Sequence, residues 1–265
     1  MLKLYPLYSG SSGNMYLIKS PKSTVIVDIG VSFKNLNESL EKLDISLSDV
    51  SALLITHEHS DHTKGLFTFI NKTDIPIFLT SGTWNYLYKN NSVKLKKEPN
   101  IFEVKPEKSF SIEDISITPF RTSHDAVDSV GYTFSCKDNS ITIATDLGYV
   151  SDDVLRHLED SDLNVIEANY DENLLMYGPY TYPLKRRIKS NIGHLSNDDS
   201  ADTILKLADS GKRDFILGHI SKNNNDPEQA LYTVKSNLES NGYNLNDFNI
   251  NVATRDVSYE VYELW

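Results

Sequence analysis

The feature that most restricts the fold of this 265-residue chain is the segment Thr56-His57-Glu58-His59-Ser60-Asp61-His62. It directly follows residues 52–55, an apolar run that is short and bounded, as a buried strand is. Seven histidines in the whole chain make three within six positions improbable by chance. Imidazole is a ligand for zinc, copper, iron and nickel, and carboxylate adds affinity for manganese and other hard divalent ions. The segment therefore predicts a metal site at the end of a strand.

The charge balance limits the partners that the chain can have. It contains 26 Lys and Arg against 37 Asp and Glu, which gives a net charge of −11. Proteins that coat nucleic acid or anionic membranes without specificity need a broad basic field, so this class is excluded, although a local phosphate site is not. The longest apolar runs have four residues, far below the ~20 that cross a bilayer. We therefore expect no membrane span and no membrane partner.

The N-terminus and the cysteine count indicate the compartment. The opening Met-Leu-Lys-Leu-Tyr-Pro contains no apolar stretch of ~7 to 15 residues before a small-residue cleavage site, so no secretory signal is expected. Cys136 is the only cysteine, and no intrachain disulfide can form. A reducing cytoplasm is the simplest location.

Apolar periodicity predicts strands and helices in two successive groups. The expected strands are residues 2–8, 15–19, 24–28, 52–55, 75–79, 101–104, 109–111, 115–119, 132–136, 141–145, 164–168 and 215–217, with two more after residue 238. The expected helices are near residues 33–43, 66–70, 83–89, 152–158, 197–208 and 227–238. This order favours two packed sheets with helices outside. No repeat or linker marks a boundary, so one domain over residues 1–265 is expected.

The pattern His57-x-His59-x-Asp61-His62 after a buried strand resembles the signature of the metallo-β-lactamase fold, a four-layer αβ/βα sandwich of the α+β class. The remaining ligands of that family come later, as isolated residues at the ends of strands. His124, Asp146 and His219 each follow a predicted strand and occur in the expected order. The resemblance therefore implies a di-metal hydrolase.

Carried over residue by residue, the resemblance implies two divalent ions, zinc or manganese. One would be held by His57, His59 and His124, the other by Asp61, His62 and His219, with Asp146 bridging them. The electrostatics agree, because two acids in one pocket repel unless cations neutralise them. Two such ions activate water and polarise an ester or phosphoryl oxygen. Asp28, which ends a predicted strand, matches an early Asp that orients the His57 loop from behind the ligands; a simple Asx turn is the alternative.

The segment Asn191-Ile-Gly-His194-Leu-Ser-Asn197 narrows the reaction. It resembles a His-Leu-Thr/Ser segment of the ribonuclease Z branch, which supplies a non-ligand His near the leaving oxygen. A phosphodiester needs such a group, because its departing alkoxide is a poor leaving group that an imidazolium can protonate. We therefore predict His194 and Asp61 as catalytic residues. The alternative is a helix-start residue that is hydrogen-bonded only to the backbone.

Five segments together resemble the YycJ/WalJ family of Gram-positive bacteria, and the resemblance spans residues 7–225. They are residues 9–14, 167–171, 178–188, 193–197 and 219–224. The family implies a single-domain nuclease with 5′-to-3′ exonuclease action on DNA. Tyr170 departs from the pattern, because the family usually has His there, but no metal ligand is lost.

Substrate contacts are predicted in three places. The Ser-Gly turn at residues 9–14 can present N–H groups and hydroxyls to a phosphate, because Gly permits a positive φ; it is equally well a hairpin turn. The basic cluster near residue 186 can hold a nucleic-acid backbone, or be a solvated helix face. Tyr177, Tyr180 and Tyr182 can stack on bases, or pack in the core. The predicted substrate-binding residues are Ser11, Ser12, Asn14, Lys185, Arg186, Arg187, Ser196 and Asn197.

The sequence thus predicts a di-metal phosphodiesterase, a 5′-to-3′ DNA exonuclease that acts on single strands or ends. Residues 147–218 are too few for the large inserted domain of the β-CASP nucleases, and no long Gly-Pro arm for tRNA exists, which makes structured RNA the weaker substrate class. Two alternatives stay open. One is a small-molecule metallo-hydrolase, either a cyclic phosphodiesterase or a glyoxalase-type thioesterase. The other is a metal-bearing regulatory protein that binds nucleic acid with little turnover.

Overall fold

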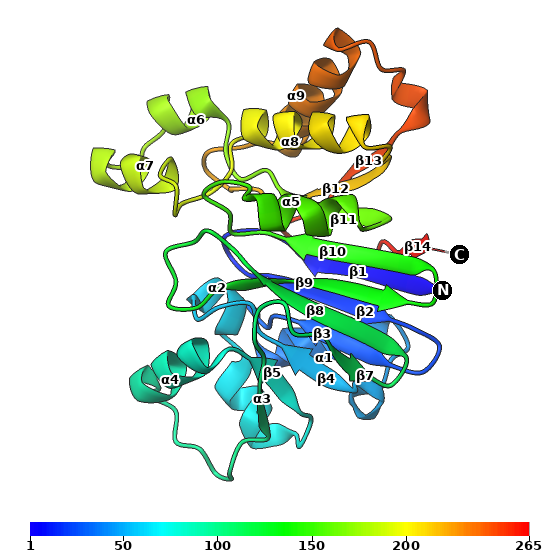
Figure 1. Cartoon of the computed structure of the whole chain (residues 1–265). Helices are drawn as coiled ribbons and strands as arrows, with labels where there is room; N and C mark the ends of the chain where they lie inside the picture. The colour runs from blue at the N-terminus through cyan, green and yellow to red at the C-terminus, as the bar shows by residue number, and fades with distance from the viewer. Residues whose placement is uncertain (265) are drawn as a thin grey trace.

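A computed structural model describes residues 1–264 as two seven-stranded sheets packed face to face (Figure 1). The first sheet is antiparallel from β14 to β3 and parallel from β3 to β6. In spatial order it contains β14 (Tyr262–Leu264), β1 (Leu2–Tyr8), β2 (Met15–Lys19), β3 (Thr24–Val27), β4 (Ala52–Leu54), β5 (Ile77–Leu79) and β6 (Ile101–Glu103).

The second sheet repeats this division. It is parallel from β13 to β10 and antiparallel from β10 to β7. In spatial order it contains β13 (Asn249–Val252), β12 (Asp214–Gly218), β11 (Leu163–Glu167), β10 (Asn139–Ala144), β9 (Val130–Cys136), β8 (Ile115–Arg121) and β7 (Phe110–Ile112). Both parallel sections therefore send the carboxyl ends of their strands to one edge, where α2 (Ser60–Thr63) lies in Figure 1.

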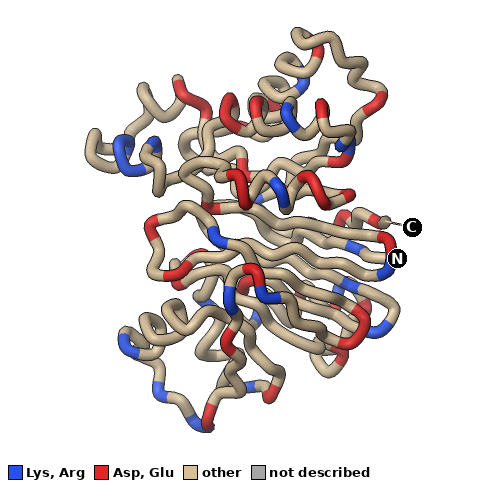
Figure 2. The backbone as a smooth tube through the Cα atoms, in the orientation of Figure 1, with Lys and Arg blue, Asp and Glu red and all other residues tan. Residues whose placement is uncertain are grey.

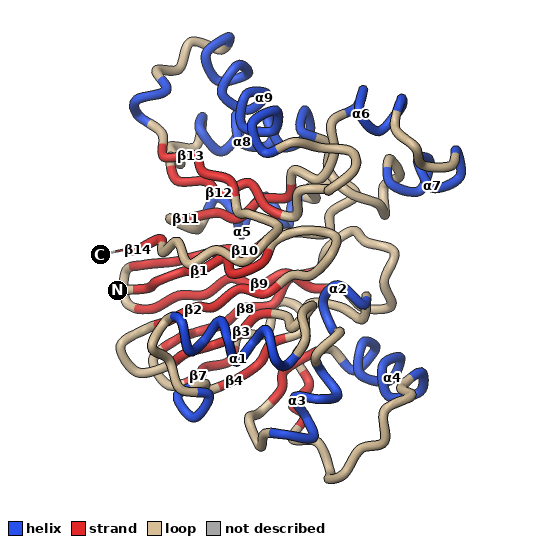
Figure 3. The backbone as a smooth tube through the Cα atoms, turned by 180° about the vertical axis from the view of Figure 1, so that it is seen from behind, coloured by secondary structure: helices blue, strands red, loops and turns tan. Residues whose placement is uncertain are grey.

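Helices cover the outer face of each sheet (Figure 3). The first sheet packs against α1 (Phe33–Lys42), α3 (Leu66–Lys72) and α4 (Ser81–Asn90). The second packs against α5 (Asp152–Glu159), α8 (Asn197–Asp209) and α9 (Pro227–Ser240). Two 3-10 helices span Leu47–Asp49 and Leu245–Asp247. The predicted four-layer αβ/βα sandwich of the α+β class is confirmed.

The space between the sheets is filled by one apolar cluster. Alternate residues of β9, among them Tyr132 and Phe134, point into it and meet Leu4 of β1, Tyr16 of β2 and Leu54 of β4. Successive side chains of a strand face opposite sides, so only every second residue of β9 contributes. This cluster, shared by both sheets, favours one domain over residues 1–265, which stays a prediction. Within residues 1–264, no helix is long and apolar enough to cross a membrane.

Most predicted elements are confirmed within a few residues, but the one-turn helix α2 and the two 3-10 helices were not predicted. Two longer helices were not predicted either. These are α6 (Glu172–Tyr177) and α7 (Tyr182–Ile188), which project beside α8 at one end of the molecule (Figure 1). Their own small core consists of Tyr170, Leu175 and Ile188. His157 of α5 packs on the second sheet, where it contacts Glu107 and Thr133 and stacks on Phe120, so its position is structural.

The shared core generates a stability prediction. Phe134→Ala removes a fully buried ring between the sheets, so we expect the free energy of unfolding to fall by about 3 to 5 kcal/mol in urea titrations. Tyr88→Ala, at a side chain that is 60% exposed, is the matched control and should change it by less than about 0.5 kcal/mol. Equal effects of the two variants would mean that the sheets do not depend on this cluster.

Candidate metal centre

Strand ends bring the predicted ligands together at one edge of the sandwich. The His57 loop follows β4, His124 follows β8, Asp146 follows β10 and His219 follows β12. Asp28, Asp146 and His219 have positive φ values of 61°, 59° and 54°. Such angles are uncommon for residues other than Gly and cost of order 1–3 kcal/mol each, so they mark positions that the surrounding structure enforces.

His57, His59 and His124 form the first cluster, with one ring nitrogen of each lying within 4.8 Å of the others. The Nδ1 of His59 is 3.2 Å from the Nε2 of His124. The other nitrogen of His124 is 3.0 Å from the carbonyl oxygen of Gly193. The Nδ1 of His57 is 3.0 Å from the hydroxyl of Thr56. Each of these outer contacts fixes a ring so that its free nitrogen faces the cluster.

Asp61, His62 and His219 form the second cluster, also within 4.8 Å of one another. The Nδ1 of His62 is 2.7 Å from Asp28 Oδ2, while its Nε2 lies 3.6 Å from Asp61 Oδ2. The Nε2 of His219 is likewise 3.6 Å from Asp61 Oδ2. Asp28 also accepts the backbone N–H of Thr56 at 2.8 Å. Asp28 therefore lies behind His62 and bonds to the backbone that leads into the His57 loop; its role in orienting metal ligands stays a prediction.

Asp146 lies between the two clusters. Its Oδ1 is 3.5 Å from His124 Nε2, and its Oδ2 is 3.3 Å from His62 Nε2. The Oδ2 of Asp146 and the Nε2 atoms of His57 and His219 are buried without a hydrogen-bond partner. Buried polar atoms are normally paired, so these atoms are available as donors to a bound group. Imidazole and carboxylate donors converging between the two clusters fit divalent metal ions.

The electrostatics of the clustered side chains lead to the same conclusion. Burial holds the pKa of His57 well below its usual range, with neighbouring imidazoles adding to the effect. Burial opposes the charged form of His62 as well, but Asp146 and Asp28 outweigh it and raise the pKa of His62 to about 9. Burial would raise the pKa of Asp146, yet His219 and His62 lower it. The buried acids thus require positive charge nearby, which metal ions held by the same residues can supply.

Glu167 is a functional candidate that sequence reasoning missed. It is the last residue of β11 and is fully buried. Its Oε1 accepts from the Nδ1 atoms of His194 and His219, both at 2.8 Å. Its Oε2 accepts the N–H groups of Leu147 and Leu195 at 2.7 and 3.2 Å. The available signal was an acid ending an apolar strand between the strands of Asp146 and His219.

His194 stands at the margin of the clusters. Its side chain is 18% exposed, and its ring centre is 5.0 Å from that of His124 and 5.2 Å from that of His219. Glu167 holds its Nδ1, so the ring is not fixed by the backbone alone, as the simpler alternative required. No described residue forms a hydrogen bond with its Nε2.

The Ser-Gly turn is built differently from the prediction. Neither Gly10 nor Gly13 has a positive φ; a Cβ would collide with Arg255 Cγ at 2.8 Å in the first case and with Gly30 O at 2.8 Å in the second. Asn14 is buried, accepts the N–H of Gly10, and its Nδ2 lies 3.1 Å from His62 Nε2. Asn14 therefore supports the second cluster instead of facing solvent. Ser11 and Ser12 are exposed.

Most of the other predicted substrate-binding residues are engaged in internal contacts. Ser196 caps α8 through Asp199, and Asn197 bonds to Asn225; both are buried and do not face a substrate. Lys185 donates to the carbonyl oxygens of Met176 and Gly178, which ties it to the end of α6. Arg187 pairs with Asp125. Arg186 is exposed and forms no ion pair within residues 1–264.

Comparison with known proteins agrees with this geometry. Residues 23–220 match the family model described as beta-lactamase superfamily domain. The chain is 39% identical to the exodeoxyribonuclease WalJ of Streptococcus pneumoniae serotype 2, over 88% of this chain and 86% of that protein. It is 34% identical to the exodeoxyribonuclease YycJ of Bacillus anthracis, over 91% and 90%. The crystal structure of Zn(2+)-bound PqqB from Methylobacterium extorquens shares the fold, with a TM-score of 0.74, 15% identity, and full coverage of both chains (100% each).

These matches confirm the metallo-β-lactamase fold and the resemblance inferred from the five sequence segments. Both relatives are covered over most of their length, so the similarity is not limited to the metal-binding segments. The chain belongs to the β-lactamase superfamily and, within it, to the WalJ/YycJ family.

Proposed function

We propose that the chain is a di-metal phosphodiesterase that acts as a 5′-to-3′ DNA exonuclease on single strands or ends. The observation that carries the proposal is the position of Asp146, which lies 3.3 to 3.5 Å from ring nitrogens of both histidine clusters. A carboxylate in that place joins two sites into one reaction centre. Relatives named exodeoxyribonucleases, at 39% and 34% identity, favour nucleic acid over other phosphodiesters.

The two clusters define which residues would hold the metals. His57, His59 and His124 would bind one ion, Asp61, His62 and His219 the other, and Asp146 both. Zinc suits the five imidazoles, and manganese suits the two carboxylates. When bound, a pair of divalent ions lowers the pKa of water and neutralises charge on a phosphoryl group.

The protein's own contribution is to orient the reacting groups and to move a proton. Glu167 accepts from His194 Nδ1, which fixes the tautomer or charged form with a hydrogen on that atom. His194 Nε2 is then the atom that faces the substrate and can donate a proton to the leaving oxygen. Asp61, partly exposed beside His219, can accept a hydrogen bond from the attacking water.

The lone cysteine supports a location. Cys136 is buried in β9 and lies in the apolar cluster between the sheets. A chain of this length without disulfides needs no oxidising compartment, and we propose the cytoplasm, where DNA is also available.

A substrate panel tests the proposed reaction class. Manganese- or zinc-loaded protein should cleave bis-p-nitrophenyl phosphate and single-stranded DNA labelled at either end, with less action on structured RNA. Gel analysis of the end-labelled strands reports the direction of digestion. Turnover of a glutathione thioester without any phosphodiester turnover would instead establish the thioesterase alternative.

Metal removal tests the centre itself. Elemental analysis should find two divalent ions per chain, and a chelator should abolish phosphodiester hydrolysis until metal is returned. Asp146→Asn should lose at least one of the two ions, because it removes a charge that both clusters face. Asp74→Asn, at a side chain that is 94% exposed, is the matched control. Retention of both ions by Asp146→Asn would contradict the bridging position.

The role of His194 can be separated from metal binding by the leaving group. We expect His194→Ala to lower kcat for DNA by about 10²- to 10⁴-fold, because the alkoxide loses its proton donor. Hydrolysis of bis-p-nitrophenyl phosphate should fall much less, since nitrophenolate leaves without protonation. Glu167→Gln should lower the turnover of both substrates, because Glu167 holds the proposed ligand His219 as well as His194. Equal losses on both substrates in His194→Ala, accompanied by loss of metal, would make His194 a ligand instead.

A further inference from the structure

We propose that the surface formed by α7 and the loop after it is a binding platform for single-stranded nucleic acid. This inference rests on the proposed nuclease function and names the substrate form and the place where the strand lies. The platform is a hollow of about 430 Å³ lined by Tyr182, Pro183, Arg186, Arg187, Ser190 and Ile192.

The hollow exposes apolar groups that a folded protein normally covers. Tyr182 is 71% exposed and Ile192 is 52% exposed, and Pro183 stands between Tyr182 and the rest of α7. The core-packing alternative for Tyr182 is therefore wrong. An exposed aromatic ring beside aliphatic side chains is the surface on which unpaired bases stack, and every base has a flat face that can use it. Bases within a duplex are already stacked and cannot do so.

One positive charge of the platform is free. The α7 segment is the densest basic region of the chain, and Figure 2 shows its Lys and Arg residues at one end of the molecule. Lys185 and Arg187 are occupied by α6 carbonyls and Asp125, and Lys189 pairs with Glu172. Arg186 forms none of these contacts and lines the hollow with Tyr182. A ring for a base and a guanidinium for a phosphate match the repeating unit of a strand.

The platform is continuous with the metal centre. Ile192 O accepts the N–H of Asp125, and Gly193 O lies 3.0 Å from His124 Nδ1. His194 follows two residues after Ile192. Arg187 of α7 pairs with Asp125, whose other oxygen is 3.5 Å from His124 Nε2. A strand lying on Tyr182 and Ile192 therefore reaches the cluster beside His194, the side on which the leaving oxygen is expected.

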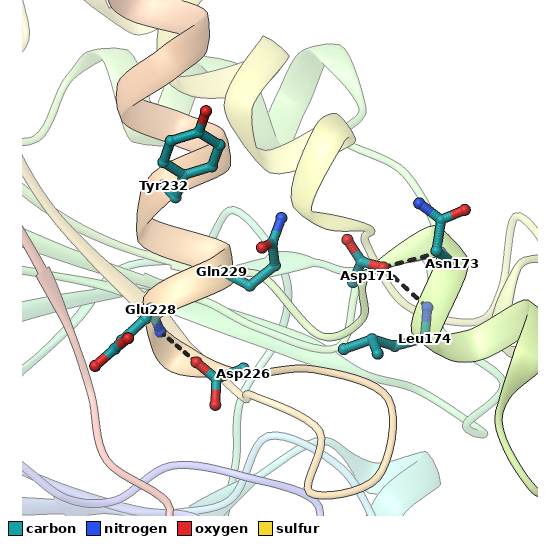
Figure 4. A pocket seen from close by; sticks show the side chains of 7 residues that line it. All are labelled: Asp171, Asn173, Leu174, Asp226, Glu228, Gln229 and Tyr232. Atoms are coloured by element: carbon teal, nitrogen blue, oxygen red, sulfur yellow. Dashed lines mark hydrogen bonds between the residues drawn. The ribbon is translucent and has the colours of Figure 1, made fainter.

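A second hollow nearby has a charge that is unsuited to binding a nucleic-acid strand. It lies between α6 and α9, and Figure 4 shows its lining residues. Asp171 and Asp226 point into it while capping the two helices, and Glu228 adds a third carboxylate. Phosphates would be repelled there. Its tyrosine, Tyr232, is 66% exposed, close to the exposure of Tyr182. Tyr232 is thus the matched control for a ring in the opposite charge environment.

The test measures binding and turnover on the metal-loaded full chain. Affinity is measured by fluorescence anisotropy with a labelled phosphorothioate oligothymidylate, which resists hydrolysis, and KM with the ordinary DNA strand. We expect Tyr182→Ala to weaken binding and raise KM by about 5- to 150-fold. Tyr182→Phe keeps the ring and should have the affinity and KM of the wild type. Arg186→Ala should reduce the slope of log affinity against log salt by about 0.7. A blunt duplex of the same length should bind more weakly than the single strand.

Three results would overturn the platform: wild-type affinity in Tyr182→Ala, equal losses in Tyr182→Ala and Tyr232→Ala, or duplex binding as tight as single-strand binding. An unchanged salt slope in Arg186→Ala would show that Arg186 does not contact a phosphate of the strand. Failure of the proposed function is distinguishable, because it would appear as wild-type protein that hydrolyses neither bis-p-nitrophenyl phosphate nor DNA. The anisotropy series does not depend on turnover and would still decide the platform.

Discussion

The burial of carboxylates at one edge of the sandwich is the constraint on which the rest of the site depends. Asp28, Asp146 and Glu167 are 1%, 3% and 0% exposed, and each stands at or just after the end of a parallel strand. An ionised carboxylate cannot stay in such a place without hydrogen bonds or positive charge. The imidazoles that face these acids supply hydrogen bonds, and the unpaired ligand atoms between them can bind cations that supply positive charge.

The buried acids divide into two groups with different tasks. Asp28 and Glu167 lie behind the histidine rings and accept from their Nδ1 atoms: Asp28 holds His62, and Glu167 holds His194 and His219. Asp146 faces the space that both clusters share, and its Oδ2 has no partner. Carboxylates of the first group set ring orientation and tautomer, which increases the basicity of the other nitrogen. Asp146, the one member of the second group, instead offers its oxygens to a group bound between the two clusters. Asn14 extends the outer support to the second cluster.

The sequence could predict features that depend on local patterns, but not features that depend on contacts between residues distant in the chain. The strands and the gathering of the histidines at one edge of the sandwich were predictable, because apolar runs of fixed period and a dense histidine segment are local patterns. Glu167 was not assigned, since a single acid at the end of a strand is common and acquires meaning only when β10, β11 and β12 lie side by side. Asn14 and Asn197 were predicted to bind substrate, and their internal bonds could not be foreseen because the partners, His62 and Asn225, are distant in sequence. Helices α6 and α7 are too short for a clear period.

The distribution of charge also limits how this acidic chain could bind nucleic acid. With a net charge of −11, the molecule as a whole repels nucleic acid, and long-range attraction cannot concentrate it. Three of the four cations near α7 serve internal contacts, so affinity for a strand would have to come from short-range contacts and from any metal ions held by the two clusters. Stacking on an exposed ring is such a contact, and it is available only to unpaired bases. Selection of single strands or frayed ends would then follow from the charge of the platform, because a duplex would offer its phosphates to a helix on which three of four cations already serve internal contacts.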